Sequence, residues 1–170
     1  MRLMSQPELM LATIFPEDWP EVCAIYAEGI ATGHATFETE TSDWPKWNAD
    51  HLECCRLIAR AENEIVGWAA LRRVTSRAVY TGVAEVSVYI AARARGQRVG
   101  WPLLQALVEQ SERAGIWTLQ ASIFTENAVS IHLHERCGFR IVGRREKIGC
   151  LHGVWRDTLL LERRSTIAGK

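Results

Sequence analysis

The chain has 170 residues, 48% of them hydrophobic and 24% charged, a balance typical of one globular domain with a substantial core. Its 20 basic and 20 acidic side chains leave no formal net charge, which argues against nucleic acid or an anionic membrane as the main partner. No apolar run reaches the roughly 18–20 residues of a membrane span, and residues 1–8 lack the order of a signal peptide.

Apolar runs and helical stripes alternate through the first half of the chain. A strand at 9–15 is followed by a stripe at helical spacing, which predicts a helix that opens within 16–20 and ends at a pair of glycines. The other elements expected here are an extended piece at 35–39, a helix from about 42 to 52, and strands at 56–61 and 65–73.

The second half continues the alternation after a polar loop at 74–82. Expected there are strands at 83–90, 117–124 and 139–142, helices at 101–115 and 127–138, a charged, glycine-containing loop at 144–153 and a last apolar run at 158–161. The order β-α-α-β-β-β-α-β-α-β-β predicts a mixed α/β sheet without the strict alternation of a doubly wound fold. We expect a single domain over residues 1–170, with its core at about 9–163.

The passage from the strand at 83–90 into the helix at 101 is the most informative segment. A strand that runs through a short turn into a helix leaves backbone N–H groups unpaired at the helix start, and these donors and the helix dipole favour a phosphate. Gly96 and Gly100 allow close backbone approach, and Arg95 and Arg98 add positive charge. The same residues are also compatible with an ordinary solvated connection.

A second motif occupies the helix expected from residue 127. Asn127, Ser130 and His134 follow one another at helical spacing and are expected to share one face. An apolar stripe of Val129, Leu133 and Cys137 is expected on the opposite face, so that the polar face lines a ligand. The alternative is an ordinary amphipathic helix with a capping asparagine and a surface histidine.

Glu85 is the candidate general base. It lies within an apolar, β-branched strand just before the basic turn, where a charged residue is unfavourable unless it faces a cleft. Desolvation there would make its carboxylate a better proton acceptor for an ammonium group. The alternative is a strand-edge glutamate paired with one of the nearby arginines.

These motifs resemble those of the GNAT superfamily of acyl-CoA N-acyltransferases. The turn is similar to the family's pyrophosphate loop, Q/R-x-x-G-x-G/A, with Arg95 first, Gly100 last and Arg98 where the middle glycine is usual. The segment from Asn127 to Phe139 resembles the second family motif. More narrowly, residues 11–162 resemble phosphinothricin N-acetyltransferases, on the segments 36–40, 84–90, 133–136 and 153–157.

The resemblance implies a mixed, mostly antiparallel sheet flanked by helices, and acetyl-CoA as cosubstrate without a metal. The pantetheine arm is expected on the backbone of a splayed strand, in the manner of an added β-strand whose N–H also polarises the thioester carbonyl. The implied donor-site residues are Val88, Tyr89, Ile90, Arg95, Gly96, Gln97, Arg98, Val99, Gly100, Trp101, Asn127 and Ser130. His134, at the position of the family's tyrosine acid, is implied to lie near the sulfur and to orient it or protonate the thiolate.

The implied acceptor is a glutamate-like phosphinic, arsinic or sulfoximine amino acid, whose oxyanions suit arginine forks. Its α-amine attacks the thioester directly, with Glu85 as base, by contact or through one water. Acceptor-site residues implied by the resemblance are Phe37, Arg77 and Tyr80, with Arg72 and Arg73 in place of the basic residue that other members carry at Thr75. A homodimer is implied too, with parts of both chains near the acceptor.

Two alternatives remain open at this stage: an acetyltransferase of another small amine or a protein N-terminus, and a CoA-binding module without turnover. The five cysteines, including adjacent Cys54 and Cys55, show no zinc-site spacing. A vicinal thiol site is possible, but we favour one of these two thiols facing the core and the other facing solvent, in a reduced cytoplasmic protein.

Overall fold

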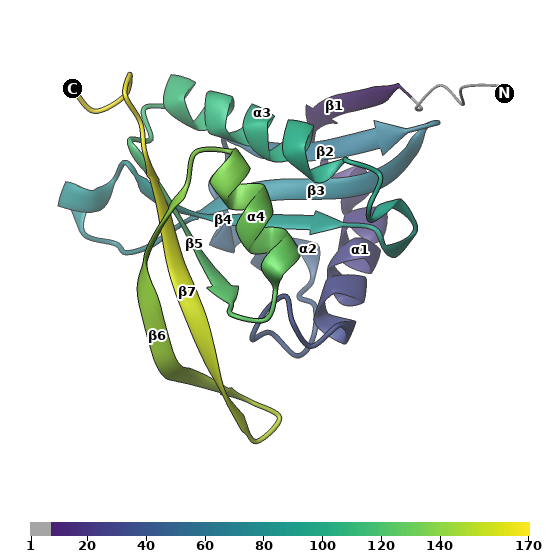
Figure 1. Cartoon of the computed structure of the whole chain (residues 1–170). Helices are drawn as coiled ribbons and strands as arrows, with labels where there is room; N and C mark the ends of the chain where they lie inside the picture. Colours follow the sequence, from purple (N-terminus) through teal and green to yellow (C-terminus); the bar gives the residue numbers. More distant parts are fainter. Residues whose placement is uncertain (1–7) are drawn as a thin grey trace, which may run out of the picture.

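The structure, a computed structural model, describes residues 8–170. The sequence predicts no signal peptide in residues 1–8, and residues 1–7 of that segment lie outside the described part. Seven strands form one sheet in the order β1-β2-β3-β4-β5-β7-β6 (Figure 1). They are β1 (Leu9–Thr13), β2 (Arg56–Ala61), β3 (Glu64–Arg73), β4 (Val83–Ile90), β5 (Thr118–Phe124), β6 (Arg140–Leu151) and β7 (Val154–Arg164).

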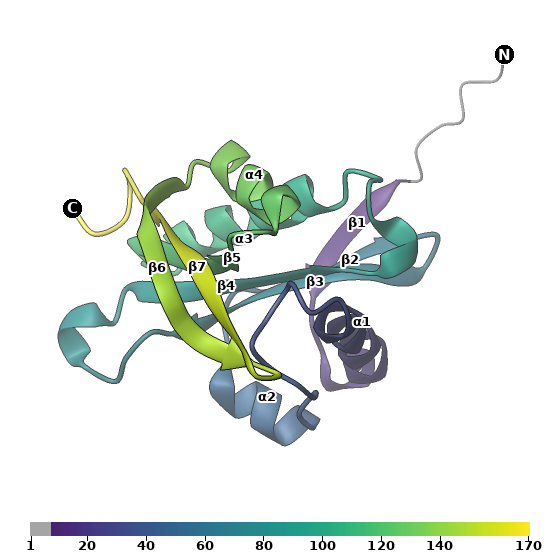
Figure 2. The same ribbon diagram turned by 60° about the horizontal axis from the view of Figure 1, so that its bottom comes forward.

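Four helices cover the two faces of this sheet. They are α1 (Trp19–Ala31), α2 (Trp44–Asp50), α3 (Gly100–Arg113) and α4 (Ala128–Arg136), with 3-10 turns at Pro16–Asp18, Ala78–Tyr80 and Ala92–Ala94. Figure 2 shows α3 and α4 on one face and α1 and α2 on the other. All neighbouring strands are antiparallel except β4 and β5, so the predicted mixed, mostly antiparallel sheet and the predicted element order are confirmed.

Aromatic rings fill the space between the sheet and helices α1 and α2. Trp47 and Trp68 are each 1% exposed, and their ring centroids lie 5.7 Å apart in an edge-on contact. Trp19 and Trp44 pack on Trp47 from α1 and α2. Core packing therefore accounts for Trp44 and Trp47, whereas Trp155 is 61% exposed.

The opposite face is covered by α3, whose predicted apolar stripe is fully buried. Gly67 of β3 permits the close approach, since a Cβ there would lie 2.8 Å from Cδ1 of Ile90 and 3.3 Å from Cδ2 of Leu103. The residues of the stripe are Leu103, Leu104, Leu107 and Val108.

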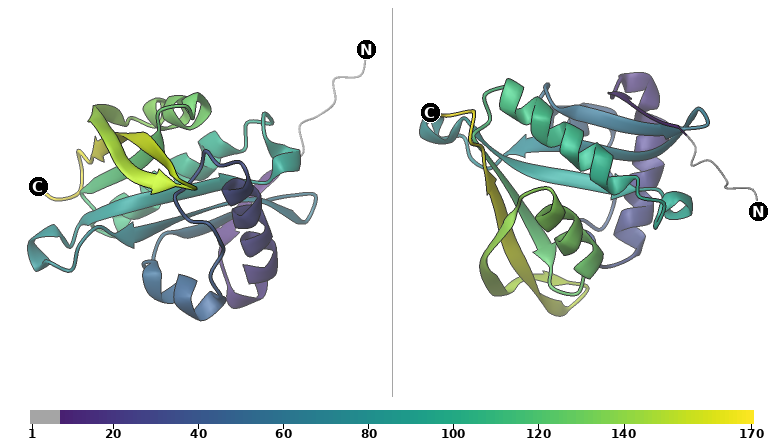
Figure 3. Two further views of the ribbon diagram at one scale, coloured as in Figure 1. Left: turned by 90° about the horizontal axis from the view of Figure 1, so that it is seen from below. Right: turned by 45° about the horizontal axis from the view of Figure 1, so that its top comes forward.

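The C-terminal hairpin is longer than the sequence predicts. The expectation of a short strand at 139–142 and a loop at 144–153 is wrong, because β6 and β7 pair through almost their whole length. Only His152 and Gly153 separate the strands, both with positive φ, as a type I′ turn requires. Nearly every β6 residue is exposed and the register shifts twice, so no alternation marks the strand. Figure 3 shows this hairpin curving across the molecule.

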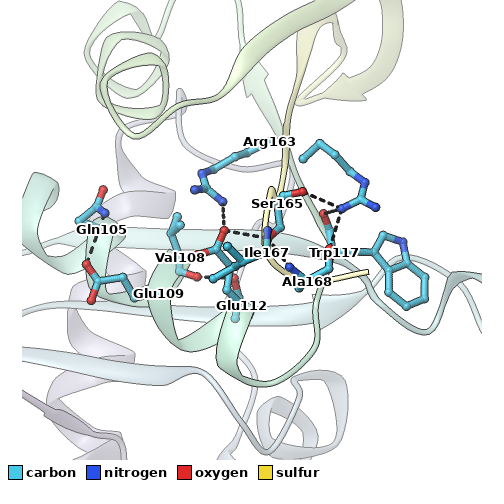
Figure 4. Close-up of polar contacts among 11 residues, drawn as sticks. Gln105, Val108, Glu109, Glu112, Trp117, Arg163, Ser165, Ile167 and Ala168 are labelled. Atoms are coloured by element: carbon cyan, nitrogen blue, oxygen red, sulfur yellow. Dashed lines mark hydrogen bonds and ion pairs between the residues drawn. The ribbon is translucent and has the colours of Figure 1, made fainter. Parts of the chain in front are cut away.

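The end of β7 is fastened to the last turns of α3 (Figure 4). The Glu112 carboxylate accepts hydrogen bonds from Nη1 of Arg163 at 2.8 Å and from Oγ of Ser165 at 2.9 Å. Burial alone would raise the pKa of Glu112, but these two donors and the charge of Arg163 lower it. Ser165 in turn accepts from the backbone N–H groups of Ile167 and Ala168, which holds the chain end against the sheet.

Of the adjacent cysteines, one faces the core and the other faces solvent, as expected. Cys55 is 6% exposed, and burial raises its pKa to about 12, whereas Cys54 is exposed. The cysteines of residues 8–170 are free thiols. Within this part of the chain, none of the helices has the length and apolar character needed to cross a bilayer.

Candidate active site

The site is built around an opening between β4 and β5. The parallel ladder pairs Val83 with Thr118 and ends at the pair of Glu85 and Gln120, after which the two strands diverge (Figure 1). The antiparallel partner β3 continues alongside β4 as far as Ile90. From residue 86 to residue 90, β4 therefore has a ladder partner on its β3 side alone within residues 8–170. The stretch expected to bind a pantetheine arm, Val88, Tyr89 and Ile90, lies in this opening.

The turn between β4 and α3 presents backbone donors. Among the described residues, none accepts a hydrogen bond from the backbone N–H of Arg98, Val99, Gly100 or Trp101. The N-cap residue of α3, Val99, makes no side-chain capping bond. Unpaired donors at the positive end of a 14-residue helix suit a pyrophosphate, so the residues present fit the group that the sequence implies.

Arg98 has a backbone conformation that favours glycine. Its φ is +64°, and Gly96 two residues earlier has φ +76°. The left-handed conformation costs a residue with a Cβ roughly 1–2 kcal/mol, so Arg98 strains the loop. Both side chains of the pair Arg95 and Arg98 are exposed, and Nε of Arg95 donates to the carbonyl of Ile90 at 3.2 Å.

Three further residues at this turn shape its edges. The side chain of Gln97 donates to the carbonyl of Arg93 and closes the turn on itself. Trp101 is 42% exposed beneath the guanidinium of Arg136, which lies 5.8 Å from the ring centroid. A Cβ at Gly100 would lie 3.1 Å from Cδ2 of Leu133, so glycine lets α3 begin directly against α4.

Helix α4 begins as predicted, but the faces of its side chains differ from the prediction. The Oδ1 atom of Asn127 accepts from the N–H of Ser130 as an N-cap, and its Nδ2 donates to the carbonyl of His34. The expected division into a polar face opposite an apolar face is wrong, since Val129 is 83% exposed and His134 is 2% exposed. The histidine instead lies under the helix, with its ring centroid 5.0 Å from that of Phe139 in an edge-on contact.

His134 is a buried neutral imidazole. Its Nδ1 lies 2.8 Å from the carbonyl oxygen of Ser130, so this nitrogen carries the proton and donates it. Burial lowers the pKa of His134, and the bond to Ser130 offsets only part of this effect. The other nitrogen, Nε2, is buried without a hydrogen-bond partner among the described residues and is an acceptor in this tautomer.

Glu85 lines an open pocket of about 410 Å³ at the start of the strand opening. Its Oε1 accepts from Nη2 and Nε of Arg72 at 2.9 and 3.2 Å, and the Glu85 side chain is 22% exposed. The arginine partner that the sequence left as an alternative to a functional carboxylate is thus present, in the same pocket. The lining residues are Asp50, Arg72, Arg73, Val74, Glu85 and Gln120.

This pocket gathers two guanidinium groups and two carboxylates. Such a mixture suits a zwitterion, whose acid groups need arginine donors and whose ammonium group needs a carboxylate. The sequence did not single out Asp50 and Gln120. Alternation along 117–124 places Gln120 on the polar face of its strand, but only the register of the sheet places it beside Glu85.

The other predicted acceptor residues lie elsewhere in the chain. Arg77 and Tyr80 are exposed on the projecting loop between β3 and β4, with the guanidinium 5.4 Å from the phenol ring centroid, and neither lines the pocket. Phe37 packs edge-on against Phe124 at 4.7 Å between ring centroids, and Gly149 of β6 lies against it. One chain therefore brings Glu85, Arg72 and Arg73 together but leaves Arg77 and Tyr80 outside the pocket.

Comparison with known proteins agrees with this architecture. Residues 11–139 match the model of the acetyltransferase (GNAT) family. A phosphinothricin N-acetyltransferase of Alcaligenes faecalis is 34% identical over 86% of this chain and 78% of its own length. An L-methionine sulfoximine/L-methionine sulfone acetyltransferase of Pseudomonas aeruginosa is 30% identical over 85% of this chain and 88% of its own length.

A solved structure shares the arrangement of the elements. The phosphinothricin acetyltransferase of Sinorhizobium meliloti, crystallised in complex with acetyl-CoA, superposes with a TM-score of 0.85 at 25% identity over 95% of this chain and 90% of that one. The family match covers most of this chain, and the match to the Alcaligenes enzyme spans more than two thirds of that enzyme. The chain therefore belongs to the GNAT acetyltransferase family, and acetyl-CoA is its cosubstrate.

Proposed function

We propose that this acetyltransferase moves the acetyl group of acetyl-CoA to the α-amine of a phosphinothricin-like amino acid. The class comprises glutamate analogues with a phosphinic, arsinic or sulfoximine group. The observation that carries this proposal is the pairing of Glu85 with Arg72 in one pocket, at the point where β4 and β5 diverge. A base and an oxyanion-binding group then lie together, as an amino-acid acceptor requires.

On the donor side, the proposal assigns the pyrophosphate to the turn from Arg95 to Trp101 and the pantetheine arm to the backbone of 88–90. The free N–H groups of that turn support the first assignment, and the open side of β4 supports the second. Asn127 and Ser130 are assigned to the pantetheine at the start of α4. The N-cap bond between them would then also fix the helix end that the arm passes.

On the acceptor side, Glu85 takes a proton from the substrate ammonium, directly or through one water. The neutral amine attacks the thioester carbon, the C–S bond breaks, and the sulfur leaves as a thiolate that takes up the proton released by the attacking nitrogen, giving coenzyme A. A backbone N–H of the open strand would stabilise the negative oxygen that forms. No covalent enzyme intermediate is required, so the free cysteines have no catalytic part.

His134 is proposed to lie beside the departing sulfur. Its neutral ring has no proton to give at Nε2, and burial opposes the charged form that would. The unpartnered Nε2 supports a role after the C–S bond breaks, in which it accepts a hydrogen bond from the newly formed thiol of coenzyme A. His134→Phe should then slow turnover without changing its pH dependence, and full turnover in this variant would contradict the assignment.

The proposal includes a cytoplasmic homodimer in which Arg77 and Tyr80 reach the pocket of the partner chain. Both residues lie on a projecting loop outside their own pocket, and Val79 between them is 68% exposed. Phe37, which packs at the ends of β5 and β6, is assigned to the stem of the acceptor.

The direct test is release of free thiol from acetyl-CoA in the presence of single candidate acceptors. Phosphinothricin, arsinothricin or methionine sulfoximine should support release that depends on Glu85. Binding of acetyl-CoA with no release for any amine would instead indicate a CoA-binding module.

A further inference from the structure

Gln120 occupies a special position in the sheet. It is the β5 member of the last parallel pair, opposite Glu85, before the two strands diverge. In a parallel pair, residues in register project to the same face, so both side chains enter the acceptor pocket. Its neighbours Leu119 and Ala121 are 2% exposed and point to the other face, into the core under α3.

The two oxygens of Glu85 have different partners from different strands. Arg72 of β3 donates to Oε1 with Nη2 and Nε, at 2.9 and 3.2 Å. The amide Nε2 of Gln120 donates to Oε2 at 3.5 Å from the opposite side. A carboxylate held by one oxygen can still turn about its last torsion, which is soft, whereas contacts on both oxygens restrict that rotation.

The contact made by Gln120 is also the one that an acceptor does not disturb. An oxyanion that enters the pocket competes with Glu85 for the guanidinium of Arg72. Because an amide carries no net charge, an oxyanion has no comparable attraction for Gln120. While Arg72 is engaged by substrate, the bond from Gln120 then remains on the carboxylate.

We propose that Gln120 is a positioning residue that holds the Glu85 carboxylate in the orientation that accepts the proton of the acceptor ammonium. This inference rests on the proposed function and on Glu85 as the base. Gln120 does not touch the reacting atoms; it acts through Glu85, and its loss should therefore lower kcat more than it alters substrate binding.

The test compares Gln120→Met, which keeps the size of the side chain and removes its amide, with Gln105→Leu. Gln105 makes a similar contact of 3.4 Å with Glu109 on α3, outside the pocket (Figure 4). We expect Gln120→Met to lower kcat about tenfold, with acceptor KM and acetyl-CoA Kd within about twofold of wild type. Gln105→Leu should leave kcat unchanged.

A second variant keeps the test decisive if the methionine variant does not fold. Gln120→Glu places a like charge beside Glu85 and should lower kcat further, whereas Gln120→Asn, one carbon too short to reach, should match Gln120→Met. Wild-type kcat in Gln120→Met or Gln120→Glu, together with a slow Glu85→Gln, would overturn the role of Gln120 alone. A wild-type rate in Glu85→Gln would overturn the base assignment and this inference with it.

Discussion

Two nitrogens of Arg72 donate hydrogen bonds to a single oxygen of Glu85, across the antiparallel pair of β3 and β4. The two residues are in register, so a pair separated by 13 positions in sequence meets in one pocket. The guanidinium of Arg72 can also donate to a substrate oxyanion, which then competes with Glu85 for it. Catalysis and acceptor recognition are therefore expected to share this one side chain.

Arg72→Ala should lower kcat and raise acceptor KM together, because it frees Glu85 and removes an oxyanion donor. We expect a fall of about 100-fold in kcat/KM for the acceptor, with acetyl-CoA Kd unchanged. Arg72→Lys should recover part of this loss, since it keeps the charge but loses the planar fork. The matched control is Arg73→Ala, a cation of the same pocket, which should raise KM without lowering kcat. Equal kcat effects in the two alanine variants would contradict the shared role.

Arg77→Ala should raise acceptor KM by about one to two decades while acetyl-CoA affinity stays constant. The expected loss corresponds to charge-assisted hydrogen bonds of roughly 1.5–3 kcal/mol. Arg77→Lys should rescue in part. Unchanged or improved KM in Arg77→Ala, measured by initial rates at fixed acetyl-CoA, would overturn the acidic amino acid as acceptor and favour a cationic amine.

The position of Arg77 outside its own pocket allows a separate test of the homodimer. Glu85→Gln and Arg77→Ala chains, denatured and refolded together, should recover activity at low acceptor concentration. In a mixed dimer, one site combines an intact Glu85 with an intact Arg77 from the other chain. If mixed dimers are verified by mass and activity does not recover, Arg77 acts at the site of its own chain. A monomer in sedimentation would exclude the homodimer with shared sites.

Arg98→Gly should stabilise the protein although it removes a side chain. Relief of the positive φ outweighs the extra freedom that glycine gives the unfolded chain, by about 0.5–1 kcal/mol in the free energy of unfolding. The control is Gln97→Gly, at a position without positive φ, which should destabilise. Urea denaturation at pH 7 measures both, and a less stable Arg98→Gly would show that the loop carries no strain at this residue.

Stability should fall in mild acid because of His51. Burial lowers the pKa of His51 from 6.5 to about 4, although a bond to the Trp47 carbonyl opposes the shift. Between these two pKa values the unfolded chain binds a proton at His51 that the folded chain does not bind. The contribution of neutral His51 to the free energy of unfolding is therefore complete above about pH 6.5 and is lost as the pH falls towards 4. Between pH 7 and 5 we expect a loss of about 2 kcal/mol from this residue.

His51→Phe preserves the stacking on Trp47, whose ring centroid is 4.2 Å away, but cannot be protonated. Its free energy of unfolding should be lower at pH 7, since the bond to Trp47 is lost, and should change less between pH 7 and 5. The measurement is a pair of urea titrations for each protein. An undiminished acid sensitivity in His51→Phe would assign the effect to other groups, among them His134.

The sequence predicted the parts of this fold that local pattern controls. The helical stripe of α3, the alternation of β5 and the glycine-bearing turn before α3 all follow from neighbours along the chain. The sequence did not predict the β6–β7 hairpin, because a strand exposed on both faces has no alternation of apolar and polar residues to detect. The faces of α4 were also missed, since tertiary packing, which the helical period does not specify, decides that His134 is buried and Val129 is not.

The candidate site likewise has parts that the sequence could predict and parts that it could not. The turn from Arg95 to Trp101 could be located from sequence, since its function depends on a contiguous backbone. The sequence allowed an arginine partner for Glu85, but that this partner is Arg72 and that Gln120 joins it could not be located, because both contacts arise from sheet register across three strands. Even the departure at Arg98 became interpretable only through its φ angle.

The most direct test of the account is kcat/KM for L-phosphinothricin against spermidine and a peptide with a free N-terminus, in wild type and in Glu85→Gln, from thiol release at saturating acetyl-CoA. We predict a preference for phosphinothricin of at least about 100-fold, and a fall in its kcat of about 100-fold or more in Glu85→Gln with acetyl-CoA Kd unchanged. A preference for spermidine or the peptide would contradict the acceptor class. A wild-type rate in Glu85→Gln would contradict the mechanism.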